Sequence, residues 1–153
     1  MAWVFFHRFK LGQLDAAGQP GAPVDFDTDS VRILLITSAV NPASHVATWQ
    51  DVTEMLSTAS VAEVSGTNYA RKTLSSVDAT LSAGTITVDG SDPSVYSQSG
   101  SGFSDARYAI LYKYNASDAS AGVIAYYDLG SNKGNVSGDL TLQLSAAGLF
   151  TLA

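Results

Sequence analysis

The sequence contains no cysteine, and only 14% of its 153 residues carry a charge. The absence of cysteine excludes disulfide frameworks, thiolate zinc sites and thiol nucleophiles. A domain of this length buries roughly 70% of the surface that its unfolded chain exposes, so it needs neither a disulfide nor a metal to fold. We therefore expect residues 1–153 to form one globular domain.

Clusters of positive charge and long apolar runs are also absent. Eight basic residues stand against 14 acidic ones, for a net charge of -6, and the basic residues are scattered along the chain. Because binding to a phosphate backbone needs clustered cations, we expect no nucleic-acid partner. No apolar run reaches about 18 residues, and the basic residues of segment 1–9 follow its apolar run, so we expect neither a membrane-spanning helix nor a secretory signal.

Histidine is scarce, and the common catalytic motifs are missing. The two histidines, His7 and His45, have no second ligand-type residue three or four positions away, as helical metal sites commonly do. The string closest to a nucleophile elbow, residues 102–106, lacks the final glycine. No phosphate loop or dinucleotide fingerprint is present. These observations predict a protein that is not an enzyme and that holds no cofactor.

One acidic group stands out. Asp25, Asp27 and Asp29 alternate along the chain, and alternate aspartates can direct three carboxylates toward one calcium ion. The rest of a calcium loop does not fit, because Ser30 stands where its glycine and Ile36 where its glutamate would be. We therefore predict a solvated turn before the next strand and no metal site, with a cation at these three aspartates as the alternative.

What the sequence does contain is a series of short strand patterns between turns rich in Gly, Asn and Ser. Residues 139–145 alternate strictly between apolar and polar, and residues 31–37 form a nearly continuous apolar run typical of a central strand. Residues 107–115 and 122–129 are rich in aromatic and branched side chains and predict a hairpin. Further strands are predicted at residues 61–65, 70–74, 84–89 and 149–152.

A single helix is predicted, at residues 48–56. Trp49, Val52 and Leu56 have helical spacing there, and Thr48 and Asp51 are arranged like a capping box. Residues 91–104 are predicted to be an exposed loop. The fold class predicted is all-β, a jelly-roll-like β-sandwich with one short helix and an apolar N-terminal segment.

That N-terminal segment has large apolar side chains on nearly every side, whether it is read as a helix or as a strand. Two interpretations stay open. The segment packs into the core of its own domain, or residues 1–15 form an arm that packs against a neighbouring subunit, because large exposed apolar patches usually mark interfaces. The candidate interface residues are Trp3, Val4, Phe5, Phe6, Phe9, Leu11 and Leu14.

In the order of its segments the chain resembles a family of small structural proteins of tailed-bacteriophage virions, the head decoration or capsid cement proteins. The resemblance runs nearly from end to end. It is carried by the aromatic start at residues 3–14, DFDTDSVRILLITSAVNP at 25–42, ATWQDVTE at 47–54, EVSGTNYARKTL at 63–74, DARYAILYKYN at 105–115 and the stretch from 121 to the end. The chain departs from the family in a longer insert at 16–24 and extra residues at 55–60.

The resemblance implies a jelly-roll-like sandwich that binds assembled major capsid protein and associates with itself as a dimer or trimer. We accordingly expect a non-enzymatic decoration protein on the capsid surface of the virion, made in the cytoplasm of a bacterial host. A tail or neck component is the alternative within the same class. A carbohydrate-binding module is the alternative from another class, with Tyr96, Tyr126 or Tyr127 as platforms for sugar rings.

Overall fold

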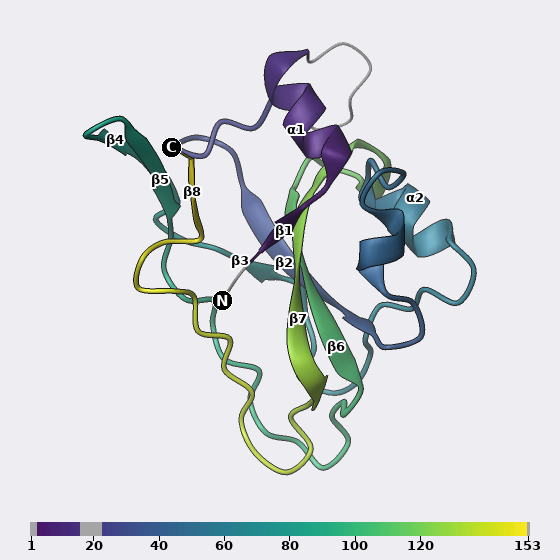
Figure 1. Ribbon diagram of the computed structural model, residues 1–153. Helices are drawn as coiled ribbons and strands as arrows, with labels where there is room; N and C mark the ends of the chain where they lie inside the picture. Colours follow the sequence, from purple (N-terminus) through teal and green to yellow (C-terminus); the bar gives the residue numbers. More distant parts are fainter. Residues whose placement is uncertain (1–2, 16–22, 153) are drawn as a thin grey trace.

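Two antiparallel sheets form the framework of the fold in a computed structural model that describes residues 3–15 and 23–152 (Figure 1). The five-stranded sheet has the order β1-β7-β6-β2-β3, and the three-stranded sheet has the order β4-β5-β8. The strands are β1 (Val4–Phe5), β2 (Val31–Thr37), β3 (Lys72–Thr73), β4 (Asp78–Ser82), β5 (Thr85–Asp89), β6 (Ala106–Lys113), β7 (Val123–Lys133) and β8 (Phe150–Leu152). The helices are α1 (His7–Leu14) and α2 (Val52–Ser57), with short 3-10 turns η1 (Pro42–His45) and η2 (Asp118–Ser120). The prediction of a mostly β protein is confirmed, but the described residues form two α-helices where one was predicted.

The middle of the large sheet is buried on both faces. Consecutive residues of β2 point in opposite directions, and both Leu34 and Leu35 are fully buried. Leu35 belongs to a core cluster on one face of the sheet, and Leu34 belongs to a second cluster on the other face. This double burial explains the continuous apolar run of β2 and confirms it as an internal strand. The predicted hairpin is confirmed as the antiparallel pair β6 and β7.

One face of the large sheet is covered by α2 and the turn before it. Trp49, Val52 and Met55 are buried there among the side chains of the second cluster. The helix begins at Val52 rather than at residue 48, because the carboxylate of Asp51 accepts the amide hydrogen of Glu54 at 2.8 Å and thereby caps the helix. The prediction identified Trp49 and Val52 correctly, but it named the partly buried Leu56 in place of Met55 and put the start of the helix one turn too early.

The opposite face is covered by the small sheet and by long extended segments. Val88 of β5 and Leu149 pack in the same cluster as Leu35. Residues 91–104, predicted to be an exposed loop, also contribute to this cluster, because Tyr96 and Phe103 are buried in it with ring centroids 5.5 Å apart. This stretch is rich in Ser and Gly, and its polar composition therefore did not predict that two of its aromatic side chains lie in the core.

The strand predicted at residues 139–145 is wrong, although its burial alternates as expected. Leu142 is buried between the exposed Thr141 and Gln143, but only Leu140 forms a bridge, to Tyr96. Farther along, the amide of Leu144 binds the carboxylate of Asp92 instead of a neighbouring strand. Period-two alternation reports which side chains face the core, and it does not show that a partner strand is present.

Several other strands differ from the prediction in their extent. Residues 61–65 form only an isolated bridge at Glu63, and the strand predicted at 70–74 shrinks to β3. β7 continues through Gly130 to Lys133, where a turn was predicted. β4 was not predicted, although Ala79 and Leu81 alternate there with polar residues, and it pairs with β5 around the turn residues 83–84.

The N-terminal segment wraps around the outer edge of β7. Val4 and Phe5 pair with β7, and Phe6, at the start of α1, is fully buried against Trp49 and Tyr126. Phe9 of α1 stacks on Phe5 at the other side of the turn. This part of the segment therefore belongs to the core of its own domain. Neither α1 nor α2 is long and apolar enough to cross a membrane, and the same holds for every helix in the described ranges.

Candidate functional site

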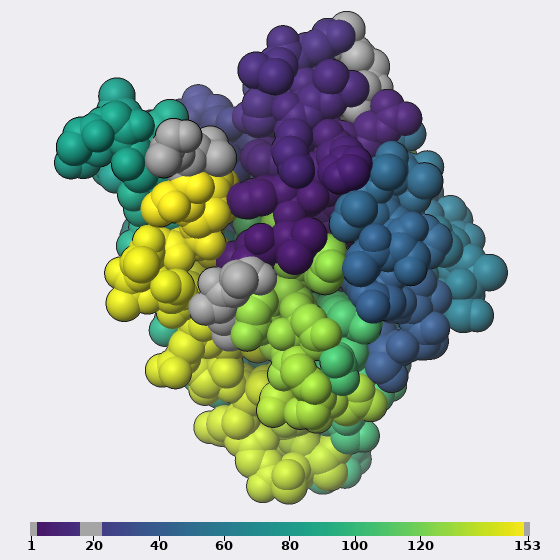
Figure 2. Space-filling model, viewed as in Figure 1, coloured from purple at the N-terminus to yellow at the C-terminus, as the bar shows by residue number. Residues whose placement is uncertain are grey.

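An apolar groove lies between α1 and the small sheet, with a volume of about 550 Å³. In the space-filling view the β4–β5 hairpin projects from the body beside α1 (Figure 2). The groove is lined by Phe5, Phe9, Lys10, Gln13, Leu14, Phe26, Ala79, Ile86, Val88 and Phe150. Most of these side chains are apolar, so the groove is a surface suited to burial by a partner.

Four phenylalanine rings from three distant segments of the chain meet at the groove. Phe5 and Phe9 stack with centroids 5.5 Å apart, one from the end of β1 and one from the first turn of α1. Phe150 meets Phe5 edge-on at 4.6 Å, and Phe26 contacts both Phe9 and Phe150. Edge-to-face contacts of this kind stabilise by about 1 kcal/mol each beyond the area that they bury. The four rings therefore pack against one another along the groove.

The rim of the groove is exposed. Leu14 at the end of α1 is 91% exposed, and Leu81 near the tip of the β4–β5 hairpin is 72% exposed. Ile86, opposite Leu81 in the hairpin, is 39% exposed. Single exposed apolar residues are ordinary, but here Leu14 and Ile86 line one apolar groove, and Leu81 lies beside Ile86 on the same face of the hairpin.

The candidate interface residues predicted from the sequence divide into two groups. Phe6 is buried, and Trp3, Phe5 and Phe9 are partly buried against their own domain. Val4 and Leu11 are each 44% exposed, and Leu14 is nearly fully exposed. The sequence did not identify Phe26, Ile86 or Phe150 as neighbours of this segment, because their proximity depends on long-range folding.

The three aspartates weighed as a cation site have other partners. Within this turn the carboxylates of Asp25 and Asp29 accept backbone amides, and the carboxylate of Asp27 accepts the amide of Ala79 at 2.9 Å. Asp29 also forms an ion pair of 2.7 Å with Lys113. The side chain of Thr28 and the amide of Asp27 lower the pKa of Asp25 below its ordinary value. Among the residues that the structure describes, no group of three acidic, histidine or cysteine side chains is placed to hold a metal ion.

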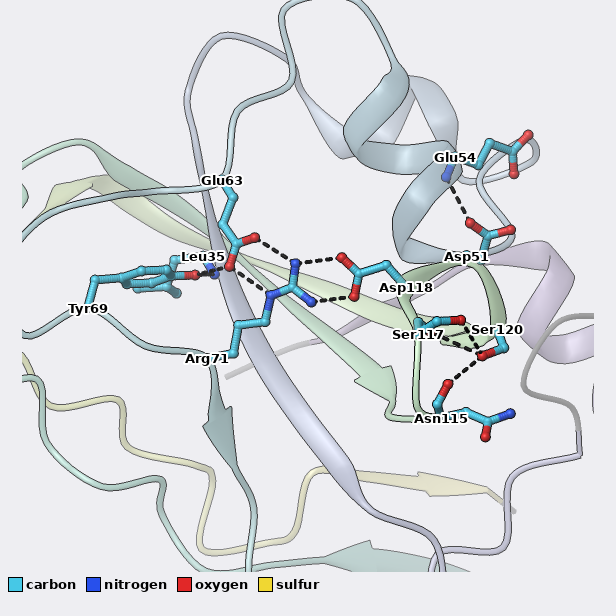
Figure 3. Close-up of polar contacts among 10 residues, drawn as sticks. All are labelled: Leu35, Asp51, Glu54, Glu63, Tyr69, Arg71, Asn115, Ser117, Asp118 and Ser120. Atoms are coloured by element: carbon cyan, nitrogen blue, oxygen red, sulfur yellow. Dashed lines mark hydrogen bonds and ion pairs between the residues drawn. The ribbon is translucent and has the colours of Figure 1, made fainter.

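The most connected polar cluster surrounds Arg71 (Figure 3). Its guanidinium makes two hydrogen bonds to the carboxylate of Glu63 and two to that of Asp118, at 2.6 to 2.9 Å. The hydroxyl of Tyr69 donates to Glu63 and accepts the amide hydrogen of Leu35. Both carboxylates raise the pKa of Arg71, and Arg71 lowers that of Asp118. Since the charges satisfy one another, this cluster joins β2, the segment before β3 and η2 rather than offering a free reactive group.

The tyrosines weighed as sugar platforms do not offer open faces. Tyr96 is fully buried and Tyr126 is 8% exposed. Tyr127 is half-buried and packs against Trp3 with centroids 5.9 Å apart. The interpretation of Tyr96 and Tyr126 as stacking platforms is therefore wrong, because both rings belong to the core.

Comparison with known proteins gives no relative for this chain. No family model, no curated protein and no solved structure matches it.

Proposed function

We propose that this chain is a non-enzymatic structural protein of a tailed-bacteriophage virion, which binds the assembled capsid shell as a decoration or cement protein. It would contact the major capsid protein and further copies of itself. We also propose that the two sheets form a jelly-roll-like sandwich. The class of protein is proposed because the order of the chain's segments resembles that of the head decoration proteins of tailed bacteriophages.

The observation that carries the proposal is the exposed apolar rim of the groove. Leu14 and Leu81 are the two most exposed large apolar side chains among the described residues. A protein working alone gains nothing from such exposure, whereas a cement protein needs a contact of modest area that is repeated many times over a shell. The stiff double-sided core supports this use, because a rigid element loses little entropy when it is bound.

The experiment is to locate the chain in purified particles and to test the rim by mutation. We expect cryo-EM density on the outer shell, with a copy number in fixed ratio to the major capsid protein. Leu14→Asn should weaken sedimentation with shells that lack the protein, while its melting temperature stays within a few degrees of the wild-type value. Val136→Asn is the matched control, since Val136 is 38% exposed and does not line the groove.

Density confined to the portal or tail would replace the decoration role with the neck or tail role. Absence of the chain from particles would remove the virion proposal altogether. Equal binding of Leu14→Asn and the wild type would show that the groove is not part of the contact.

A further inference from the structure

The groove between α1 and the small sheet has the size of a small-molecule site. Its volume is about 550 Å³, and sites for small ligands commonly measure roughly 300 to 1,000 Å³. α1 contributes lining side chains on one side, and the projecting β4–β5 hairpin contributes them on the other (Figure 2). A space of this volume between two elements can therefore hold a small molecule.

Contacts within the chain already form the groove. Phe5 stacks on Phe9 with ring centroids 5.5 Å apart, and Phe150 meets Phe5 edge-on at 4.6 Å. The carboxylate of Asp27 accepts the amide hydrogen of Ala79 at 2.9 Å, which fixes β4 to the turn that carries Phe26. Because these contacts exist without a ligand, binding costs the protein little conformational entropy.

The lining of the groove is apolar except on α1. Its two polar residues are Lys10 and Gln13, and no acidic residue lines it. None of the described residues forms a hydrogen bond or an ion pair with the side chain of Lys10. Lys10 thus places an unpaired positive charge beside apolar surface, in a chain whose net charge is -6. The ligand that complements this groove has a long apolar part and one anionic group.

We propose that the groove binds the anion of a single-chain fatty acid. The alkyl chain would lie along the phenylalanine rings, and the carboxylate would accept a hydrogen bond from the ammonium group of Lys10. Gln13 lies three residues further along α1, so its side-chain amide is on the same face and can donate to the second carboxylate oxygen. Lys10 is exposed, so the carboxylate stays in contact with water and loses little solvation.

An alkyl chain fits this lining better than a peptide does. A peptide would bring backbone amides and carbonyls into the groove, and its apolar side chains offer them no hydrogen bonds. An alkyl chain has no polar group to satisfy. The inference goes beyond the proposed function and does not depend on it, because it concerns the free protein.

A series of chain lengths tests the burial of the alkyl chain. We expect calorimetric titration with octanoate, decanoate and dodecanoate, each below its micelle concentration, to give one bound ligand per protein chain. The affinity should rise about tenfold for every two methylenes added, because each buried methylene contributes to binding. Binding of none of the three, or dodecanoate binding no tighter than octanoate, would overturn the proposal.

Two neighbouring residues of β4 test the location. Ala79 lines the groove, whereas Thr80 lies on the opposite face of the strand. We expect Ala79→Leu to fill part of the groove and to weaken dodecanoate binding at least about tenfold, and Thr80→Leu to bind as the wild type does. Both residues are exposed, so both variants should keep a melting temperature close to that of the wild type.

The wild type gives a check that needs no variant. Addition of dodecanoate should shift the backbone amide resonances of Phe5, Phe9 and Phe150 in a nitrogen-15 NMR titration. Equal affinity of Ala79→Leu and Thr80→Leu, or resonance shifts confined to residues away from the groove, would overturn the proposed location.

The charge of Lys10 is tested by comparing decanoate with the neutral decanol. We expect Lys10→Gln to weaken decanoate binding about threefold, as an exposed ion pair allows, and to leave decanol binding unchanged. Lys133→Gln is the matched control, since Lys133 is exposed at the end of β7 and does not line the groove. Equal effects of Lys10→Gln on both ligands, or no effect on either, would contradict the role of Lys10.

Sedimentation with capsid shells separates this inference from the decoration role. If dodecanoate binds and the protein does not bind shells, the fatty-acid site stands and the decoration role fails. If no fatty acid binds and Ala79→Leu loses shell binding, the decoration role stands, the groove holds a segment of the capsid protein, and the fatty-acid site fails.

Discussion

At the scale of single residues, Arg71 connects more of the fold than any other charged side chain that the structure describes. It ties Glu63, which follows β2, to Asp118 in η2, and its own side chain is only 23% exposed. Paired charges of this kind add little when exposed but are costly to break when partly buried, because the remaining partners lose their counter-charge.

Replacing Arg71 should therefore destabilise the protein more than replacing another paired arginine. We expect Arg71→Ala to lower the free energy of unfolding by about 2 kcal/mol, since two partly buried carboxylates are left unpaired. Arg107→Ala is the control, because Arg107 forms an ion pair with Asp128, whose side chain is 45% exposed, and an exposed pair of this kind should cost much less to break. Urea titrations of the two variants give the comparison, and equal losses would contradict the connecting role of Arg71.

The same cluster predicts a pH dependence. Arg71 lowers the pKa of Asp118 in the folded protein, so the ionised carboxylate stabilises the fold at pH values above its ordinary pKa of about 4. That contribution is lost as the pH falls through the lowered folded value. We expect the stability difference between wild type and Asp118→Asn to be larger at pH 7 than at pH 3, as measured by urea unfolding at both values. A difference that does not change with pH would show that the carboxylate charge is not what stabilises η2.

At the scale of elements, a buried asparagine joins the loops at one end of the molecule. Asn135 is fully buried, its side-chain oxygen accepts the amide of Phe103, and its amide group donates to the carbonyls of Thr67 and Ser97. A Cβ atom added to Gly102 would lie 2.0 Å from the side-chain oxygen of Asn135, so glycine is required there. Three loops distant in sequence thus depend on one side chain.

Removing this side chain should loosen all three loops at once. We expect Asn135→Ala to cost about 3 kcal/mol of unfolding free energy, because it leaves buried backbone groups without partners. Asn132→Ala is the control, since Asn132 is exposed and lies three residues away on β7. Hydrogen exchange would show whether protection falls at residues 67, 97 and 103 together. A loss confined to residues near 135 would argue against a shared anchor.

Some of the sequence patterns predicted strands correctly, and others predicted burial without predicting the strand pairing. The runs that became β2, β6 and the first part of β7 were correctly predicted because consecutive side chains there are buried and are rich in aromatic and branched residues. The burial pattern around Leu142 was predicted correctly, but its pairing was not, because alternation does not reveal the partner strand. The sequence named Phe5, Phe9 and Leu14 as candidate interface residues but did not predict a groove, and Phe26 and Phe150 reach the groove only through tertiary folding.

At the scale of the whole molecule, the exposed apolar surface and the net charge have opposite effects on self-association. The exposed apolar side chains Leu14 and Leu81 favour association, while a net charge of -6 makes two copies repel each other. Deleting residues 1–9 would not separate these effects, because Phe6 is buried in the domain and its loss would destabilise the fold. Changing the salt concentration alters the repulsion and leaves every side chain in place.

We expect self-association to strengthen as salt rises from about 20 to 500 mM, because screening shortens the reach of repulsion from roughly 20 Å to under 5 Å. Sedimentation velocity of the wild type at a fixed high concentration, repeated across that range, gives the readout. A contact made by apolar side chains such as Leu14 keeps its attraction when charges are screened. Association that weakens as salt rises would mean that opposite charges hold the copies together, and the exposed apolar side chains would then not form the contact.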